Sequence, residues 1–257
     1  MKIVVCVKPI KTQLVYPNET RSGSFVMNPY DLYALERVIE LKKQTGSTVI
    51  CLSMGAESSE ALLTKALAMG VDEAILLTDQ AYVGSDTVAT AYILSRAIKK
   101  IGGVDMVICG DRSIDGETGQ VVYGLSESLN YNGVSRIDSI TSVARSWAVA
   151  EQRGDGEVRR IKIRLPAVVS FCEFQLGQPD ISLLALKRAK RREITRWGFR
   201  DIGADTAKCG VEGSKTKVLD VKNSWVKKES ICPGGTAFDK VSAVVDVILG
   251  REYKPGA

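Results

Sequence analysis

A polar, glycine-rich segment between an apolar run and a helical pattern is the part of this sequence best suited to chemistry. The apolar run is Val104–Cys109, and the helical pattern begins at about Thr118. Buried strands of parallel sheets read as continuous apolar runs, and a helix that follows such a strand points its free backbone N–H groups at the strand's carboxyl end. The segment therefore has the layout of an anion-binding loop, and a phosphate would suit it. An ordinary strand-to-helix connection with Asp115 as the helix cap would read in the same way.

Six residues of this segment, three glycines and three polar residues, favour the binding of a ligand. Three glycines let the backbone approach a bound group closely, and three polar side chains can cap a helix or bond to hydroxyls and phosphate. The glycines are Gly110, Gly116 and Gly119, and the polar residues are Ser113, Asp115 and Thr118.

Composition limits what the rest of the chain can be. The 257 residues can bury one large core, or one core with a long appendage, and we expect the second. A hydrophobic content of 45% and a charged content of 25% are typical of a soluble globular protein. The opening run Met1–Lys8 is too short for a signal peptide, and no later run reaches the length of a membrane span. We expect a cytoplasmic protein with no membrane insertion.

The sequence contains no histidine and six cysteines. The missing histidine excludes zinc sites of the Cys/His type, Ser-His-Asp triads and imidazole acid–base catalysis. No two cysteines have C-x-x-C spacing, and most lie in apolar, strand-like runs where a reduced thiol behaves as a small hydrophobic group. We therefore expect no catalytic residue and no metal site in this chain.

Two further classes of function fit poorly. The net charge of +5 is modest, and its densest part, Lys187–Arg192, lacks the interleaved aromatic residues of a nucleic-acid surface. A solvated or partner-facing helix end is the better interpretation, so no nucleic-acid partner is expected. An adenylating or ATP-hydrolysing enzyme would need a Ser-Gly-Gly or Gly-x-x-x-x-Gly-Lys loop, and neither occurs.

The first half of the chain alternates strand-like and helix-like segments, which is the pattern of an α/β domain with a parallel sheet. The expected strands are Lys2–Val7, Thr48–Ser53, Glu73–Leu77 and Val104–Cys109. The expected helices start at Asn28, Ser58, Ser85 or Asp86, and Thr118.

The second half changes character. A β-hairpin is expected at Trp147–Gln152 and Val158–Ile163, then a strand at Ala167–Phe171 and a helix at 182–190. Residues 191–232 show little periodicity, whereas Thr236–Leu249 has an apolar helical face. We expect two parts: residues 1–190 as an α/β nucleotide-binding domain, and residues 191–257 as an extended arm and helix that pack on a partner subunit.

The order and spacing of several short motifs resemble the β subunit of electron transfer flavoproteins (ETF) over nearly the whole chain. The motifs are Val5–Lys8, Asn28–Asp31, Ala34–Glu36, Ala66–Asp72, Ser85–Thr87, Ala89–Ala91, Cys109–Gln120, Leu165–Val169 and Leu176–Pro179, ahead of Lys187–Arg192. The resemblance implies a Rossmann-like domain that binds an adenine nucleotide, FAD or AMP, and pairs with an α subunit carrying FAD.

The resemblance also implies which residues hold the nucleotide. Those expected around adenosine are Cys6, Val7, Lys8, Asn28, Ser53, Met54 and Gly55. Those expected around ribose and phosphates are Gly110, Ser113, Ile114, Asp115, Gly116, Glu117, Thr118, Gly119, Gln120 and Val121. Asp86, Thr87 and Thr90 would lie near a flavin ring or its phosphates, and Phe174 and Leu176 would recognise a dehydrogenase.

Two departures from the commoner family pattern bear on the cofactor and the partner. The segment Asp115–Gln120 is compact, which resembles the electron-bifurcating and anaerobe-type members and implies a second FAD reached by NADH. The loop Leu176–Asp180 has a changed charge, which argues against an acyl-CoA dehydrogenase of the usual kind. The expected partners are an ETF α subunit, a flavin-containing dehydrogenase, NADH and a low-potential acceptor such as ferredoxin or flavodoxin. The alternative is a non-bifurcating subunit with structural AMP that serves an acyl-CoA dehydrogenase-type partner.

Overall fold

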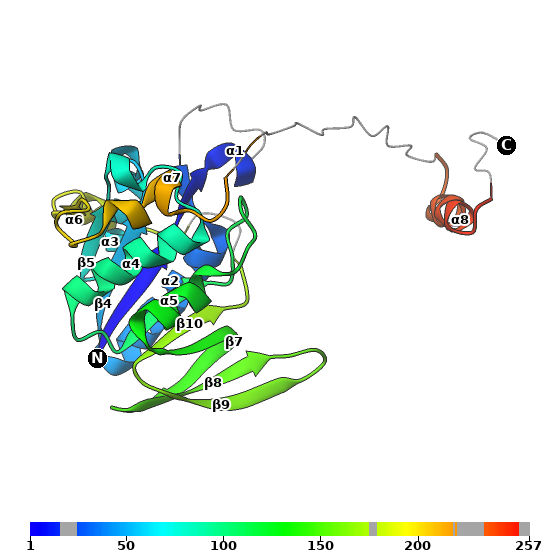
Figure 1. The fold of residues 1–257 in the computed structure, drawn as a ribbon. Helices are drawn as coiled ribbons and strands as arrows, with labels where there is room; N and C mark the ends of the chain where they lie inside the picture. Colours follow the sequence, from blue (N-terminus) through cyan, green and yellow to red (C-terminus); the bar gives the residue numbers. More distant parts are fainter. Residues whose placement is uncertain (16–24, 175–178, 218, 220–233, 252–257) are drawn as a thin grey trace. The chain divides into compact units, whose positions relative to one another are not determined.

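The computed structural model describes residues 1–15, 25–174, 179–217, 219 and 234–251. Within the chain, Met1–Lys217 and Val218–Ala257 form two separate compact units. The first unit is built on a sheet of nine strands in the order β11-β5-β4-β1-β6-β10-β7-β8-β9 (Figure 1).

Five parallel strands form the centre of this sheet: β1 (Lys2–Val7), β4 (Thr48–Met54), β5 (Glu73–Leu77), β6 (Met106–Gly110) and β10 (Ala167–Phe171). The chain moves outward from β1 through β4 to β5, and then returns to the other side of β1 for β6 and β10. This reversal between β1 and β6 is the topology of a Rossmann-like sheet, so the predicted fold class is confirmed.

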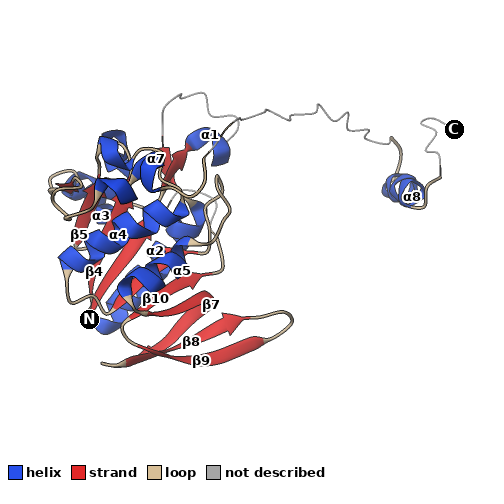
Figure 2. Cartoon of the chain, viewed as in Figure 1, coloured by secondary structure: helices blue, strands red, loops and turns tan. Residues whose placement is uncertain are grey.

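Helices cover both faces of the parallel strands (Figure 2). The helices α2 (Pro29–Thr45) and α3 (Glu60–Met69) pack on one face, and α4 (Thr87–Ile101) and α5 (Val121–Leu129) pack on the other. Alternate residues of β1 face opposite layers: Val5 packs in the α2/α3 layer and Val4 in the α4/α5 layer, both fully buried. Burial on both faces explains why these strands read as continuous apolar runs.

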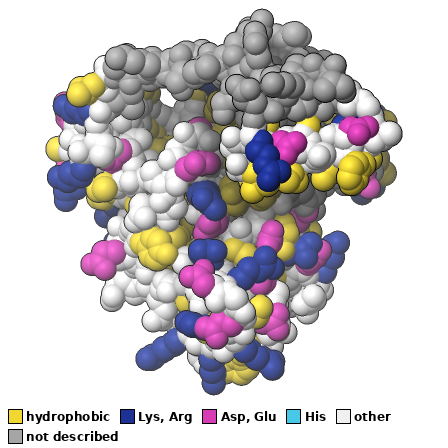
Figure 3. Space-filling model, turned by 90° about the vertical axis from the view of Figure 1, so that its right-hand side faces the viewer, with side chains coloured by type: hydrophobic (Ala, Val, Ile, Leu, Met, Phe, Trp, Pro, Cys, Tyr) yellow, Lys and Arg dark blue, Asp and Glu magenta, His cyan; other side chains and the backbone are white. Residues whose placement is uncertain are grey.

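Three further strands extend the sheet beyond β10: β7 (Asn132–Val143) runs parallel to β10, and β8 (Trp147–Arg153) and β9 (Val158–Arg164) continue the sheet in antiparallel pairs. The predicted hairpin is β8–β9, and β7 is a strand that the sequence pattern did not indicate. The edge strand β9 carries four exposed cationic side chains, Arg159, Arg160, Lys162 and Arg164. Figure 3 shows Lys and Arg side chains, with some Asp and Glu between them, at the lower end of the molecule.

Residues after 190 continue to pack on the first unit, which differs from the predicted start of the arm at 191. The strand β11 (Thr195–Trp197) pairs with β5, and the side chains of Ile202 and Cys209 are buried in the α4/α5 layer. The first unit therefore extends to Lys217, because short strand pairing and isolated buried residues hold a segment that lacks periodicity. The packing of the remaining residues on a partner stays a prediction.

The remaining short elements of the first unit are β2 (Pro9–Lys11), α1 (Thr12–Val15), β3 (Phe25–Met27), η1 (Glu57–Ser59), η2 (Gln80–Tyr82), α6 (Leu183–Ala189), η3 (Thr206–Lys208) and α7 (Gly210–Gly213).

The second unit contains the helix α8 (Ala237–Ile248), close to the range predicted from its apolar face. Its first turn is closed by a capping box in which Thr236 and Asp239 satisfy each other's backbone N–H groups. Several large apolar side chains of α8 are exposed, including Phe238, Val241 and Ile248. Across the described parts of the chain, every helix is too short or too polar to span a bilayer.

Candidate functional site

The carboxyl ends of β1 and β6 meet where the strand order reverses, and this is the place where open α/β sheets bind ligands. Lys8 follows β1 directly, and the loop 111–120 follows β6. The residues predicted to hold a nucleotide lie at the ends of β1, β4 and β6, on the loop 111–120, and at the starts of helices α2, α4 and α5.

The side chain of Lys8 ties the end of β1 to the loop. Its Nζ atom lies 2.7 Å from the carboxylate of Asp115 and 3.3 Å from Oγ of Ser113. Partial burial opposes ionisation of Asp115, but the hydrogen bonds from Lys8 and Ser113 outweigh it and hold the pKa of Asp115 below its ordinary value. The predicted site residue Lys8 is thus in direct contact with two others, Ser113 and Asp115, that lie more than 100 positions away in the sequence.

Asn28 holds the same loop from the start of α2. It is buried and occupies the N-cap position of α2, yet its side chain makes no capping bond to that helix. Instead, its amide Nδ2 donates to the carbonyl of Arg112 (2.8 Å), and its Oδ1 accepts from the backbone N–H of Ile114 (3.3 Å). The side chain of Asn28 is therefore committed to shaping the loop.

Asp31 lies beneath these contacts and was not among the predicted site residues. Its carboxylate accepts the backbone N–H of Lys8 at 2.7 Å and that of Gly110 at 3.1 Å, so it joins the ends of β1 and β6. A Cβ atom on Gly110 would lie 2.5 Å from Oδ1 of Asp31 and 2.7 Å from the backbone of Tyr30. Only glycine fits at this position. The signal in the sequence was an acidic residue in the first turn of α2, which usually serves only the helix dipole.

The loop leaves the start of α5 open. A tight turn places the N–H of Glu117 2.8 Å from the carbonyl of Ser113, and Glu117 and Gly119 have positive φ angles of 50° and 61°. The helix begins at Val121 rather than at Thr118, because these two residues leave the right-handed helical region. Gln120, at the N-cap position, makes no side-chain capping bond to α5, and Asp115 bonds to Lys8 instead. The interpretation of Asp115 as an ordinary helix cap is wrong.

An uncapped helix start has free backbone N–H donors and the positive end of the helix dipole, which together suit a phosphate. Around it, the loop residues Asp115, Gly116, Glu117, Thr118 and Gln120 are exposed, and Ser113, Ile114, Gly119 and Val121 are half-buried. The predicted phosphate segment is therefore accessible along its length.

Three further predicted residues lie at the end of β4, the strand next to β1. Ser53 is fully buried, and its hydroxyl has no hydrogen-bond partner among the described residues. Met54 is half-buried, and the N–H of Gly55 bonds to the carbonyl of Leu77 (3.1 Å). A Cβ on Gly55 would lie 2.8 Å from Pro9 and from Ser59. The close approach of Pro9 and Ser59 accounts for the glycine at position 55 through the packing of the chain itself, and the half-buried Met54 is the residue of this group that a ligand could contact.

Two predicted residues contribute mainly to the sheet. Cys6 and Val7 are 8% and 4% exposed, and their side chains pack into opposite layers. The thiol of Cys109 hydrogen-bonds with Cys6, and this bond together with burial raises the pKa of Cys109. Contact between this part of β1 and a ligand would therefore be made chiefly through the backbone.

The start of α4 is close to the start of α5, because a Cβ on Gly124 would lie only 2.7 Å from that of Ala91. Asp86 caps α4 by accepting the N–H groups of Val88 and Ala89. Its other carboxylate oxygen accepts from the backbone N–H groups of Lys215 (2.7 Å) and Thr216 (2.9 Å).

The carboxylate of Asp86 thus organises the chain itself. Burial opposes its ionisation, but these backbone bonds prevail and lower its pKa. Val211 fills the space next to Gly84, where a Cβ would lie 2.4 Å from the valine side chain. The two other predicted residues of this region, Thr87 and Thr90, are half-buried.

The structure describes one of the two predicted partner-recognition residues. Leu176 lies outside the described residues. The side chain of Phe174 is 51% exposed, and its ring centroid lies 5.4 Å from that of Tyr30. The guanidinium of Arg112 lies 5.5 Å from the centroid of the same Tyr30 ring, so Tyr30 contacts both the recognition segment and the loop after β6.

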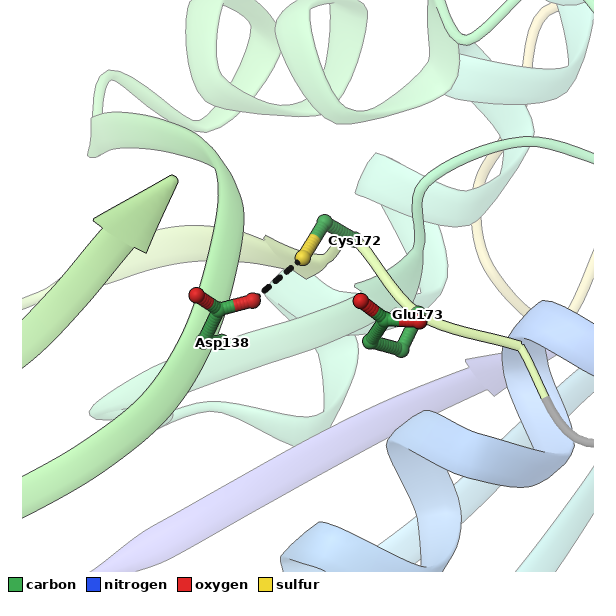
Figure 4. A group of neighbouring side chains, drawn as sticks. All are labelled: Asp138, Cys172 and Glu173. Atoms are coloured by element: carbon green, nitrogen blue, oxygen red, sulfur yellow. Dashed lines mark hydrogen bonds between the residues drawn. The ribbon is translucent and has the colours of Figure 1, made fainter. Parts of the chain in front are cut away.

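Three neighbouring side chains, Asp138, Cys172 and Glu173, lie just before the partner-recognition residue Phe174 (Figure 4). Ligand atoms of Asp138, Cys172 and Glu173 lie within 4.8 Å of one another, as in a metal site, but Arg153 forms ion pairs with both carboxylates. Cys172 donates its S–H to Asp138 at 2.8 Å, and burial followed by this hydrogen bond raises the pKa of the thiol to about 12. The protonated thiol and the two carboxylates that share Arg153 are bonded to one another and form a structural cluster.

The chain is similar to a family of known proteins over most of its length. The model of the family described as "Electron transfer flavoprotein domain" matches residues 19–199. The chain is 35% identical to the protein FixA of Bradyrhizobium diazoefficiens, over 99% of this chain and 93% of that protein.

Two other relatives carry the family's name. The chain is 34% identical to subunit CarD of the caffeyl-CoA reductase-Etf complex of Acetobacterium woodii, over 85% of this chain and 86% of CarD. It is 33% identical to the electron transfer flavoprotein subunit beta of Clostridium acetobutylicum, over 93% of each protein. The family match and the near full-length similarity show that this chain belongs to the electron transfer flavoprotein family, as an electron transfer subunit of the β type.

Proposed function

We propose that this chain binds FAD at the carboxyl ends of β1, β4 and β6 and, with an ETF α subunit, relays electrons between NADH and a flavin-containing dehydrogenase. The observation that carries the proposal is the start of α5, which has no side-chain cap while Lys8 and Asn28 hold the preceding loop in place. A site that leaves helix N–H donors free and fixes the surrounding loop is organised for an anion.

The described residues suit the parts of such a nucleotide. The free N–H groups at Val121 and the hydroxyl of Thr118 would bind phosphate oxygens, with the Lys8 ammonium supplying positive charge. The end of β4, where Met54 is half-buried, would lie against adenosine. When bound, FAD would supply hydride acceptance and one-electron transfer. The role of the chain is to bind and orient it.

The preference for FAD over AMP rests on the compact loop and on the closeness of α4 to α5. The start of α4, with the half-buried Thr87 and Thr90, lies close to α5, so a pyrophosphate bound at the exposed loop could continue along the start of α4. This geometry supports a flavin ring on the Thr87 side, because Val211 fills the space next to Gly84. A ring that NADH can reach would make this flavin the entry point for hydride, as in electron bifurcation toward ferredoxin or flavodoxin.

One observation favours the second candidate function, a structural AMP in a subunit that serves an acyl-CoA dehydrogenase-type partner. The carboxylate of Asp86 is already bonded to backbone N–H groups at both ends, and Val211 narrows the neighbouring space. AMP would need only the loop 111–120 and the adenosine residues.

The contents of the purified complex decide between the two. The chain should be copurified with its α subunit and denatured, and the released nucleotides identified by mass and absorbance. Two FAD per heterodimer, with bleaching of flavin absorbance by NADH in the absence of any dehydrogenase, would support the proposal. One FAD and one AMP, with no reaction with NADH, would establish the alternative.

A further inference from the structure

A buried carboxylate without a cationic partner lies directly under the candidate nucleotide site. Asp31 is 7% exposed, and the hydrogen bonds to its carboxylate come from the backbone N–H groups of Lys8 and Gly110, with an additional contribution from the Asn28 side chain. The described chain shows no salt bridge to Asp31, since the ammonium of Lys8 pairs with Asp115. The hydrogen bonds from the backbone and from Asn28 favour the charged form of Asp31, as does the charge of Lys8, whereas burial of the carboxylate opposes it.

The proton affinity of this group is correspondingly high. Burial raises the pKa of Asp31 to about 7, against the opposing effect of the hydrogen bonds from Lys8, Asn28 and Gly110. The carboxyl group is therefore balanced between its two protonation states near neutral pH, and a change of charge in its surroundings shifts that balance.

The other groups that face Asp31 keep their charge in this range. Burial raises the pKa of the Cys51 thiol on β4, and the hydrogen bond with Cys6 and burial raise that of Cys109 on β6, so both remain neutral. On the loop, Asp115 remains ionised because its pKa is lowered. A proton exchanged under the loop is therefore assigned to Asp31.

Asp31 is also joined to the loop that would hold the phosphates. Asn28 contacts the Asp31 carboxylate and bonds to Arg112 and Ile114 of the loop. Gly110, at the start of the loop, donates its N–H to Asp31. The local charge is already negative: Lys8 is paired with Asp115 and Arg112 with Asp111, which leaves the charge of Asp31 uncompensated. The arrival of phosphates at the open start of α5 adds further negative charge to this region.

We propose that Asp31 takes up a proton when the phosphates of a nucleotide bind at the loop 111–120, so that nucleotide binding is coupled to proton uptake near neutral pH. Two anions in one low-dielectric region repel, and protonation of Asp31 removes one of the charges. Linkage then requires that the nucleotide binds more tightly as the pH falls. This inference rests on the proposed function only in assuming that a phosphate-bearing nucleotide occupies the site.

The test is isothermal titration calorimetry on the heterodimer after the nucleotide has been removed from the β site. FAD is the better probe, because its pyrophosphate has no group that titrates near pH 7. Titrations at pH 7.5 in two buffers of different ionisation enthalpy give the number of protons taken up. If FAD binding raises the pKa of Asp31 by one unit above 7, roughly half a proton is taken up per FAD bound at this pH. Asp31→Asn should abolish this proton uptake.

The matched control is Asp72→Asn. Asp72 also accepts a backbone N–H, that of Val49 at 2.8 Å, but it is paired with Lys42 at the opposite end of the strands. Burial opposes ionisation of Asp72, yet the bonds from Lys42 and Val49 prevail and lower its pKa, so it carries its charge throughout this range. Proton uptake in Asp72→Asn should equal that of the unmodified complex.

A measurement on the unmodified complex keeps the test independent of whether Asp31→Asn folds. For a one-unit rise in pKa, the dissociation constant of FAD should be about sixfold lower at pH 6.5 than at pH 8.5. A flat profile, or proton uptake that persists in Asp31→Asn, would overturn the coupling while FAD binding stands. If AMP binds in place of FAD, and Asp31→Asn removes part of its proton uptake, the coupling stands and the FAD proposal fails.

Discussion

The ring of Phe174 packs 5.4 Å from the ring of Tyr30, and the latter also lies beneath the guanidinium of Arg112. The segment expected to meet a dehydrogenase and the loop expected to hold a nucleotide are therefore attached to the same residue of α2. Substitution of Phe174 can therefore test the contact with a dehydrogenase separately from nucleotide binding, because Phe174 is half-exposed and is not part of the loop.

Phe174→Ala should weaken the complex with the dehydrogenase by about 1–2 kcal/mol, the range of an exposed aromatic anchor at an interface. Electron transfer to or from the dehydrogenase, followed by flavin absorbance, should slow at limiting concentration, while the nucleotide content stays unchanged. Loss of nucleotide along with electron transfer would place Phe174 in the support of the site instead.

Thr118→Val should lower nucleotide retention through loss of one hydrogen bond to a charged phosphate, which costs roughly 1.5–3 kcal/mol. The two side chains are nearly the same size, and Thr118 is exposed, so the melting temperature without nucleotide should not change. Occupancy after extensive dilution is the measurement. Full retention would mean that Thr118 only precedes the helix.

Gly110→Ala should destabilise the chain by about 1–3 kcal/mol, because the new methyl group would overlap Asp31 and Tyr30 in a packed region. Gly116→Ala is the matched control: it lies in the same loop, and its nearest neighbour to a Cβ is Ser113 at 3.4 Å. Thermal unfolding of both variants should show a lower melting temperature for Gly110→Ala alone. Equal melting temperatures would mean that the strand ends can separate to admit a side chain.

Asp31 should give the stability of the chain a defined pH dependence. Folding raises its pKa from an ordinary value of 3.8 to about 7, so the folded chain binds more protons than the unfolded chain between these values. The contribution of Asp31 to stability is therefore greatest below about pH 4 and declines as the pH rises to 7, by at most a few kcal/mol. Relative to Asp31→Asn, the melting temperature of the unmodified chain should fall between pH 5 and pH 8. Parallel profiles would contradict the assignment.

Val241→Asp should prevent assembly with the α subunit if the exposed apolar face of α8 is covered by that partner. Val241 is 62% exposed and shares a face of the helix with Phe238 and Ile248. The neighbouring Ser242→Asp introduces the same charge on the polar face and is the control. Copurification of the two subunits should be lost in Val241→Asp only. Retained assembly in both variants would show that α8 contributes little to the interface.

The sequence was sufficient for the parallel strands because they are buried on both faces. β1 and β5 have the predicted bounds, and the strand predicted at Val104–Cys109 is displaced by two residues or fewer at either end. β7 was missed because its residues alternate irregularly: the register shifts twice against β8, and Arg136 has a positive φ of 58°. β11 was missed because three residues paired with β5 leave no periodic signal.

The sequence predicted site residues where a residue of suitable type lies at the end of a strand. Lys8, Asn28, Ser113 and Asp115 are brought together as the motifs suggest. Asp31 and Tyr30 were not singled out, because their contacts to Gly110, Arg112 and Phe174 depend on how α2 crosses the sheet. A helix-start carboxylate gives no sign in the sequence that it will face backbone groups of another strand.

The four cations of β9 bear on how copies of this chain behave toward one another. An edge strand has unpaired backbone groups that can extend a sheet into a neighbouring molecule. Two β9 strands placed side by side would bring Arg160 and Lys162 against like charges, and a pair of like charges across strands is destabilising. The same edge can still accept an acidic strand. Charge repulsion at β9, the edge that the extension of the sheet leaves open, therefore opposes self-aggregation by edge-to-edge strand pairing.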